Sequence, residues 1–383
     1  MLLFAAAAMI AAACSQNSVE GEIEIPLPDY DCNAEGFVNA IKSIEVINLQ
    51  VDSNSMYNEE ANLLVSPNYY YFISKGLHLM CYEKATGKLL CSKSVMGRSR
   101  AECTNLSNSF VFGDSLVIND YGKLKMYDQT GKFCGLLGDV ESYGSGSVLP
   151  LGNGYISCNK WGTPNKSLTV FDSAFNAKGS YFEVPDEYKF SAAYHISNTS
   201  PDVYVFNDTL RFYYQFVYRL HSFPGNNTYH FVTTNPYPES KLKNIDGGKM
   251  FETLNDIRSN GYASNLYDLT ENQEFISFKY DIGDGQKRCI VLLSKRNNSV
   301  YCIKAPRDNW ESPLDVWAVI FGSQFLYSDG KYFYVRAHKQ ASKFLDDHKN
   351  ILDDRQRAIL DTMQARLART DEQDFNFYYK IEF

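Results

Sequence analysis

The chain has 383 residues, of which 44% are hydrophobic, 15% aromatic and 21% charged. Its formal net charge of -8 argues against a nucleic-acid partner, because such proteins need a basic surface to displace counterions. No apolar run reaches the roughly 18 residues that a membrane-spanning helix needs, and the richness in tyrosine and phenylalanine is typical of strands.

The chain opens on a short apolar run, and residues 1–13 are predicted to be a signal peptide. Three alanines immediately precede Cys14. This arrangement resembles the lipobox of bacterial lipoproteins, which implies that Cys14 is lipidated and becomes the mature N-terminus. The alternative is a plain secretory signal followed by a chance cysteine. We therefore expect a membrane-anchored lipoprotein of the cell envelope, held on the outer membrane and facing the periplasm or the cell surface.

Residues 14–36 combine acidic side chains with Pro26 and Pro28, and contain no basic residue. This composition predicts an extended acidic tether that holds the folded part away from the membrane. The folded part is then expected to occupy residues 37–383.

Eight cysteines follow Cys14, and none lie at zinc-finger spacing, so no structural metal is predicted. Between Cys81 and Cys91 the chain contains Ala85-Thr86-Gly87, which predicts a hairpin with Gly87 in the left-handed conformation. This hairpin places Cys81 opposite Cys91, within reach of a disulfide. The alternative is that both are small buried hydrophobic residues.

The hairpin recurs along the chain. Gly131 occupies the same place in a similar sequence 44 residues after Gly87, and Gly179 is taken as a third copy, 48 residues further on. Strand–turn–strand units at this period predict a six-bladed β-propeller, in which each period forms one four-stranded blade. The expected blade cores are 69–95, 110–137, 148–184, 203–233, 274–304 and 319–335 completed by a strand at 375–383.

Residues 37–49 are expected to supply the strand that closes the ring. Two insertions, at about 236–272 and 340–370, are predicted to be helical; the second shows an apolar stripe among charged residues. A β-sandwich with a helical tail is the alternative fold, but it would not explain the repeat.

The lipobox, the blade turns and the stretch from Gly97 to Glu102 together resemble the six-bladed β-propeller lipoproteins of Bacteroidota, described as TolB-like or NHL-like. Members often have Gly-Arg-Gly-Pro-Gly-Glu at this place; this chain keeps Gly97, Arg98 and Glu102. The resemblance implies the fold and an envelope location, but no defined activity.

Arg98, Arg100 and Glu102 alternate, so an extended chain would direct all three the same way. In one interpretation the guanidinium groups bind a carboxylate or phosphate of a ligand at the mouth of the ring. In the other, Arg98 pairs with Glu102 or a blade carbonyl and holds the crossover between two blades.

The sequence predicts no catalytic set, metal site or cofactor. His195, His221 and His230 have no distinctive spacing, and the last two are expected in the outer hairpin of blade 4. We therefore expect a lipid-anchored, non-enzymatic binding or scaffold protein for a protein, peptide or glycan partner. The alternative is an envelope carbohydrate-active enzyme, a lyase or lactonase that uses residues of the propeller channel.

Overall fold

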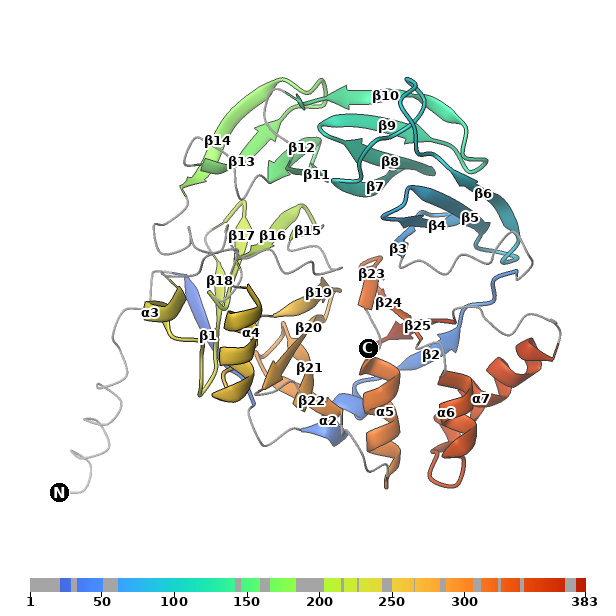
Figure 1. Cartoon of the computed structure of the whole chain (residues 1–383), viewed down its shortest axis with the longest axis vertical. Helices are drawn as coiled ribbons and strands as arrows, with labels where there is room; N and C mark the ends of the chain where they lie inside the picture. The colour runs from blue at the N-terminus through green and yellow to red at the C-terminus, as the bar shows by residue number, and fades with distance from the viewer. Residues whose placement is uncertain are drawn as a thin grey trace.

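The computed structural model confirms a six-bladed β-propeller: six antiparallel sheets stand in a ring around a common centre (Figure 1). The structure describes residues 21–28, 33–50, 61–141, 146–158, 166–183, 203–214, 217–225, 227–242, 250–264, 266–282, 287–305, 311–322, 325–337, 341–368 and 377–383.

Each blade has four strands, which we call A to D from the innermost strand outward. Blade 1 consists of β3 (Ala61–Val65), β4 (Tyr69–Ser74), β5 (His78–Glu83) and β6 (Leu89–Ser94). Blade 2 consists of β7 (Asn108–Phe112), β8 (Ser115–Asp120), β9 (Lys123–Tyr127) and β10 (Phe133–Asp139). Blade 3 consists of β11 (Ser147–Leu151), β12 (Gly154–Cys158), β13 (Lys166–Phe171) and β14 (Ala177–Glu183).

The other three blades follow the same order. Blade 4 contains β15 (Val203–Phe206), β16 (Thr209–Tyr213), β17 (Arg219–Phe223) and β18 (Thr228–Val232). Blade 5 consists of β19 (Tyr267–Glu271), β20 (Phe275–Ile282), β21 (Lys287–Ser294) and β22 (Val300–Ala305). Blade 6 consists of β23 (Phe325–Ser328), β24 (Tyr332–Arg336), β25 (Tyr378–Glu382) and β2 (Ser43–Val46).

Ring closure follows the prediction. The outer strand of blade 6 is β2, which comes from the N-terminal part of the chain and pairs antiparallel with the C-terminal strand β25. Sequence-distant ends of the chain thus complete one sheet, and no blade is left open at the junction.

The hydrophobic core lies between the blades. Each of the six junctions between neighbouring blades holds its own cluster of buried side chains. Many of the largest fully buried side chains are aromatic, among them Tyr71, Tyr127, Tyr280 and Tyr379. The high aromatic content therefore serves mainly to pack one sheet against the next.

The predicted tether is wrong in part, because residues within 14–36 belong to the ring. Strand β1 (Glu22–Pro26) pairs in parallel with β18 and makes blade 4 a five-stranded sheet. Ile25 is 1% exposed. The alternation of Glu22, Ile23, Glu24 and Ile25 suits an edge strand with one buried face.

The repeated C–D turn is confirmed in blades 1 and 2 and corrected in blade 3. Gly87 and Gly131 both have positive φ angles, of 69° and 70°. In blade 3 the equivalent position is Phe175, with a φ of 63°, 44 residues after Gly131. The amide of Phe175 donates to the Asp172 carbonyl, as the Gly131 amide does to that of Asp128. Gly179 instead lies within β14.

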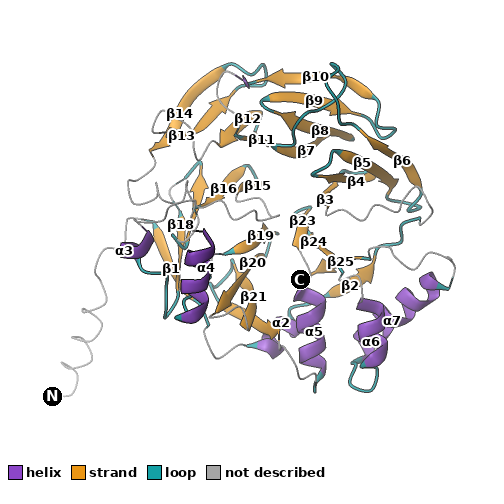
Figure 2. Ribbon diagram, in the orientation of Figure 1, coloured by secondary structure: helices purple, strands orange, loops and turns teal. Residues whose placement is uncertain are grey.

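The named helices lie beside blades 4, 5 and 6 (Figure 2). The first predicted insertion contains α3 (Glu239–Leu242) and α4 (Met250–Ser259), but its end forms the inner strand β19 of blade 5. The second contains α6 (Ala341–Asp347) and α7 (Asp354–Leu367), as predicted. Two further helices, α2 (Ala34–Asn39) and α5 (Pro313–Gly322), were not predicted, and α5 replaces the expected start of a strand at residue 319.

The alternating strand directions give the ring two different faces. One, which we call the turn face, carries the A–B turns of two or three residues and the C–D turns. Hydrogen bonds join neighbouring A–B turns there: the Asp114 carboxylate accepts from Asn68, that of Asp208 from the Gly152 amide, and the Gly330 carbonyl from the Gln273 amide. The opposite loop face carries the B–C turns and the connections between blades, one of which joins β6 of blade 1 to β7 of blade 2.

Candidate functional site

The connection between blades 1 and 2 forms a compact loop, which we call the crossover loop (residues 95–107). The Gly97 amide donates to the Cys103 carbonyl at 2.9 Å, and the Cys103 amide donates to the Val95 carbonyl at 2.8 Å. The Glu102 amide closes a tighter turn onto the Ser99 carbonyl at 3.1 Å. The segment is therefore folded back, and the prediction that an extended chain directs Arg98, Arg100 and Glu102 the same way is wrong.

The Glu102 carboxylate holds the tip of this loop through the main chain. It accepts a hydrogen bond from the Ser99 amide at 2.9 Å, and this bond lowers the pKa of Glu102. A Cβ atom at position 97 would collide with the same carboxylate, so a larger residue there would displace the Glu102 side chain. Gly97 and Glu102 thus act in the crossover, although through amides and not through the predicted pairing with the Arg98 side chain.

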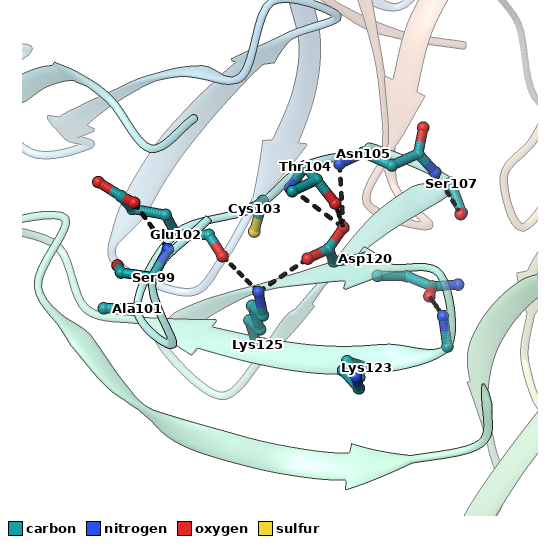
Figure 3. A network of polar contacts seen from close by, with 12 residues as sticks. Ser99, Ala101, Glu102, Cys103, Thr104, Asn105, Ser107, Asp120, Lys123 and Lys125 are labelled. Carbon is teal, nitrogen blue, oxygen red and sulfur yellow. Dashed lines mark hydrogen bonds and ion pairs between the residues drawn. The ribbon is translucent and has the colours of Figure 1, made fainter. Parts of the chain in front are cut away.

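A buried ion pair lies beneath the loop (Figure 3). Lys125 Nζ is 2.7 Å from Asp120 Oδ2, with the two side chains only 8% and 6% exposed. Lys125 also donates to the Glu102 carbonyl, so one ammonium group joins blade 2 to the crossover loop.

Asp120 accepts the hydrogen bonds of the C-terminal end of the crossover loop. Its Oδ1 accepts from the Thr104 amide at 3.2 Å, the Thr104 hydroxyl at 3.0 Å and the Asn105 amide at 2.9 Å. Burial alone would raise the pKa of Asp120, but the hydrogen bonds from Lys125 and Thr104 outweigh it and lower the pKa. The carboxylate therefore stays ionised at neutral pH and fixes the loop on the blade.

Above this network, four side chains face solvent. Met96 is 55% exposed and Tyr121, in the B–C turn of blade 2, is 52% exposed. Arg98 and Arg100 are also exposed, and neither forms an ion pair with a carboxylate among the described residues. We call Met96, Arg98, Arg100 and Tyr121 the crossover patch; it lies on the loop face.

The expected opposition of Cys81 and Cys91 is confirmed, because they are direct partners in the pairing of β5 with β6. Both are buried free thiols in the structure, and burial raises the pKa of Cys81 to about 12. A disulfide between them remains a prediction. Cys302, in the outer strand of blade 5, is disulfide-bonded, whereas Cys81, Cys91, Cys103 and Cys134 are free thiols. Cys14 lies outside the described residues.

The histidines of blade 4 lie in its outer hairpin, as expected. His221 packs against the rings of Phe182 and Phe212, and burial lowers its pKa to about 4. His230 Nδ1 lies 3.2 Å from Glu22 Oε1 of β1. His195 is outside the described residues. Among the residues that the structure describes, no group of three or more His, Cys, Asp and Glu side chains is placed to hold a metal ion.

No helix of the described part of the chain combines the length and apolar character needed to cross a membrane. No family model and no curated protein matches the sequence.

Among solved structures, the chain is similar to a Bacteroides fragilis protein described as exported, with 14% identity, a TM-score of 0.66, and coverage of 94% of this chain and 99% of that one. U3-55K matches with 8% identity and a TM-score of 0.42 over 89% of this chain and 98% of its own. BamB from Moraxella catarrhalis matches with 10% identity and a TM-score of 0.34 over 78% and 87%. At these identities the first similarity supports the propeller fold.

Proposed function

We propose that this protein is a lipid-anchored propeller of the cell envelope that binds a protein, peptide or glycan partner and catalyses no reaction on it. In this proposal Cys14 carries the lipid, and the crossover patch contacts the partner. We further propose that the chain is one of the TolB-like or NHL-like lipoproteins of Bacteroidota, on the lipobox and on Gly97, Arg98 and Glu102.

The observation that supports binding is the contrast between the two sides of the crossover loop. Its inner side is fixed by a buried ion pair and main-chain hydrogen bonds, while its outer side leaves Arg98 and Arg100 exposed. A guanidinium group held on a rigid loop loses little entropy when it binds a carboxylate or phosphate. Met96 on the same loop and Tyr121 in the B–C turn of blade 2 are also exposed, and offer the apolar and aromatic contacts that are enriched at protein interfaces.

Three observations support the envelope location. The sequence before Cys14 resembles a lipobox, and Cys302 is disulfide-bonded, as is common in oxidising compartments. The Bacteroides fragilis protein with the similar fold is described as exported.

The anchor is tested by fractionating cells that express the full chain or its Cys14→Ala variant. We expect the unmodified protein to sediment with membranes and to resist extraction by high salt, and the variant to be released in soluble form. A variant that still fractionates with membranes would refute lipid anchoring at Cys14.

The patch is tested by affinity capture from detergent-solubilised membranes. We expect Arg98→Glu/Arg100→Glu to lose partners that the unmodified protein retains, because the charge reversal repels a carboxylate or phosphate. The matched control is Arg296→Glu, which reverses an exposed arginine in the C–D turn of blade 5 on the opposite face. Equal capture by all three proteins would show that the crossover patch is not the binding surface.

A further inference from the structure

The direction of β1 sets where the N-terminal segment leaves the ring. Because β1 runs parallel to β18, Glu22 stands beside Thr228 and Pro26 beside Val232. Thr228 is the first residue of β18 after the C–D turn, and its amide donates to the Gly21 carbonyl at 3.1 Å. Gly21 therefore lies at the turn face, and the chain reaches the loop face only after passing along β1.

Several contacts fix β1 to blade 4. The Glu22 carboxylate is 4% exposed and accepts from Arg219 Nε at 2.9 Å, and His230 Nδ1 lies 3.2 Å from the same oxygen. Ile25 is buried, and the Leu27 amide donates to the Val232 carbonyl at 2.8 Å. The strand is therefore a part of the ring, and the free length of any tether is counted from Gly21.

Gly21 lies seven positions after Cys14 in the sequence. A fully extended chain of that length spans at most about 25 Å. Turning the loop face toward the membrane would require the tether to run back along β1, which is about 17 Å long at the usual rise per residue. The remaining reach, roughly the difference between these lengths, is too small to clear the crossover loop and the helices on that side.

We propose that β1 orients the ring on the bilayer: the turn face lies toward the lipid headgroups, and the loop face with its crossover patch points away from them. This inference rests on the proposed lipidation of Cys14. The turn face carries only short turns, and hydrogen bonds join three pairs of neighbouring A–B turns there, so no long loop stands between this face and a membrane. The longer connections stay accessible to a partner.

The orientation is tested by acetylating lysines of the full lipidated protein in phosphatidylcholine vesicles and measuring the rate at each lysine by mass spectrometry. The soluble Cys14→Ala protein is the reference for each position. Lys88 and Lys178 report on the turn face, and Lys75 on the loop face; all three are exposed. Lys88 and Lys75 belong to the same blade, so they form a matched pair. We expect acetylation of Lys88 and Lys178 to be several-fold slower on vesicles, and that of Lys75 to be unchanged.

A second variant separates orientation from anchoring. A flexible twenty-residue glycine–serine insertion after Ser18 should leave the protein on floated vesicles but abolish the protection of Lys88 and Lys178. Protection of Lys75 instead, or equal rates at all three positions on floated vesicles, would overturn the orientation while leaving the lipid anchor intact. Failure of the lipidated protein to float with vesicles would overturn the proposed anchor, and the orientation with it.

Discussion

At the scale of single residues, Asp120 and Lys125 determine how the crossover loop is held. Both side chains are almost fully buried, and each also binds the loop, through Thr104 and Asn105 or through the Glu102 carbonyl. A buried charge without its partner is costly, so the two residues should be strongly coupled in their effect on stability.

We predict that Asp120→Ala lowers the free energy of unfolding by about 3–5 kcal/mol, because it leaves the Lys125 ammonium buried without a counterion. The double variant Asp120→Leu/Lys125→Met should be more stable than Asp120→Ala. The control is Glu141→Ala, which breaks the exposed pair with Lys123 and should leave the stability nearly unchanged, because solvent screens that pair. Urea denaturation measures all four proteins, and a double variant less stable than Asp120→Ala would contradict the coupling.

The burial of His221 makes the free energy of unfolding depend on pH. Its pKa in the folded protein is about 4, below the usual 6.5, because its ring is buried among aromatic side chains. Below pH 6.5 the unfolded chain therefore binds a proton that the folded chain does not, and stability falls as the pH falls toward 4. Between pH 7.5 and pH 5 this loss should be about 2 kcal/mol.

The matching variant is His221→Phe, which keeps an aromatic ring in the cluster and removes the titration. We expect its unfolding midpoint in urea to change less than that of the unmodified protein between pH 7.5 and pH 5. The pKa of His230 is also lowered by burial, so some pH dependence should persist. An identical pH dependence in both proteins would show that His221 does not titrate as described.

At the scale of elements, α7 holds the closure of the ring. The Arg366 guanidinium donates to the Ile47 carbonyl at 2.6 Å and also to that of Leu49, just beyond the closing strand β2. Arg355 of the same helix donates to the carbonyls of Val38 and Ile41, just before β2. Two arginines on one helix thus satisfy main-chain groups on both sides of β2.

We predict that Arg366→Met speeds hydrogen exchange at the amides of β2 and β25, because the carbonyls of residues 47 and 49 lose a buried charged donor. The free energy of unfolding should fall by about 2–3 kcal/mol. Arg357→Met is the control, since Arg357 lies on the same helix but forms only an exposed pair with Asp354. Equal exchange in both variants would show that α7 does not stabilise the closure.

The sequence predicts some elements better than others for physical reasons. The turns at Gly87 and Gly131 follow from the need for glycine at positive φ, which the sequence shows directly. Phe175 occupies the same position in blade 3 against this preference, because its ring stacks on Tyr155 at 4.3 Å. That compensation depends on a partner 20 residues away and cannot be seen in a local motif.

Helix α5 and strand β1 show two other limits. Residues 313–322 are apolar around most of the helix, so neither helical nor strand periodicity stands out. The alternation in β1 was visible in the sequence, but its acidic residues and flanking prolines favoured a tether. Glu22 is buried only because Arg219 and His230, about 200 residues later, receive it.

At the scale of the whole molecule, the propeller and its strand closure follow from the 44-residue period, whereas the candidate site does not. The motif at Gly97, Arg98 and Glu102 indicates where the crossover lies, but the fold of the loop depends on Asp120 and Lys125 of the next blade. The ring therefore has two different faces: the turn face carries short turns, and the loop face carries the crossover loop with its exposed side chains.

The most direct test of binding through the loop face is photo-crosslinking in living cells. A photoreactive amino acid replaces Tyr121 on the loop face or Arg296 on the turn face, both exposed positions. We predict a discrete crosslinked partner from position 121 that is absent at position 296 and is lost when Arg98→Glu/Arg100→Glu is added. A partner crosslinked from position 296 alone, or no adduct at 121 in correctly anchored protein, would contradict the proposed function.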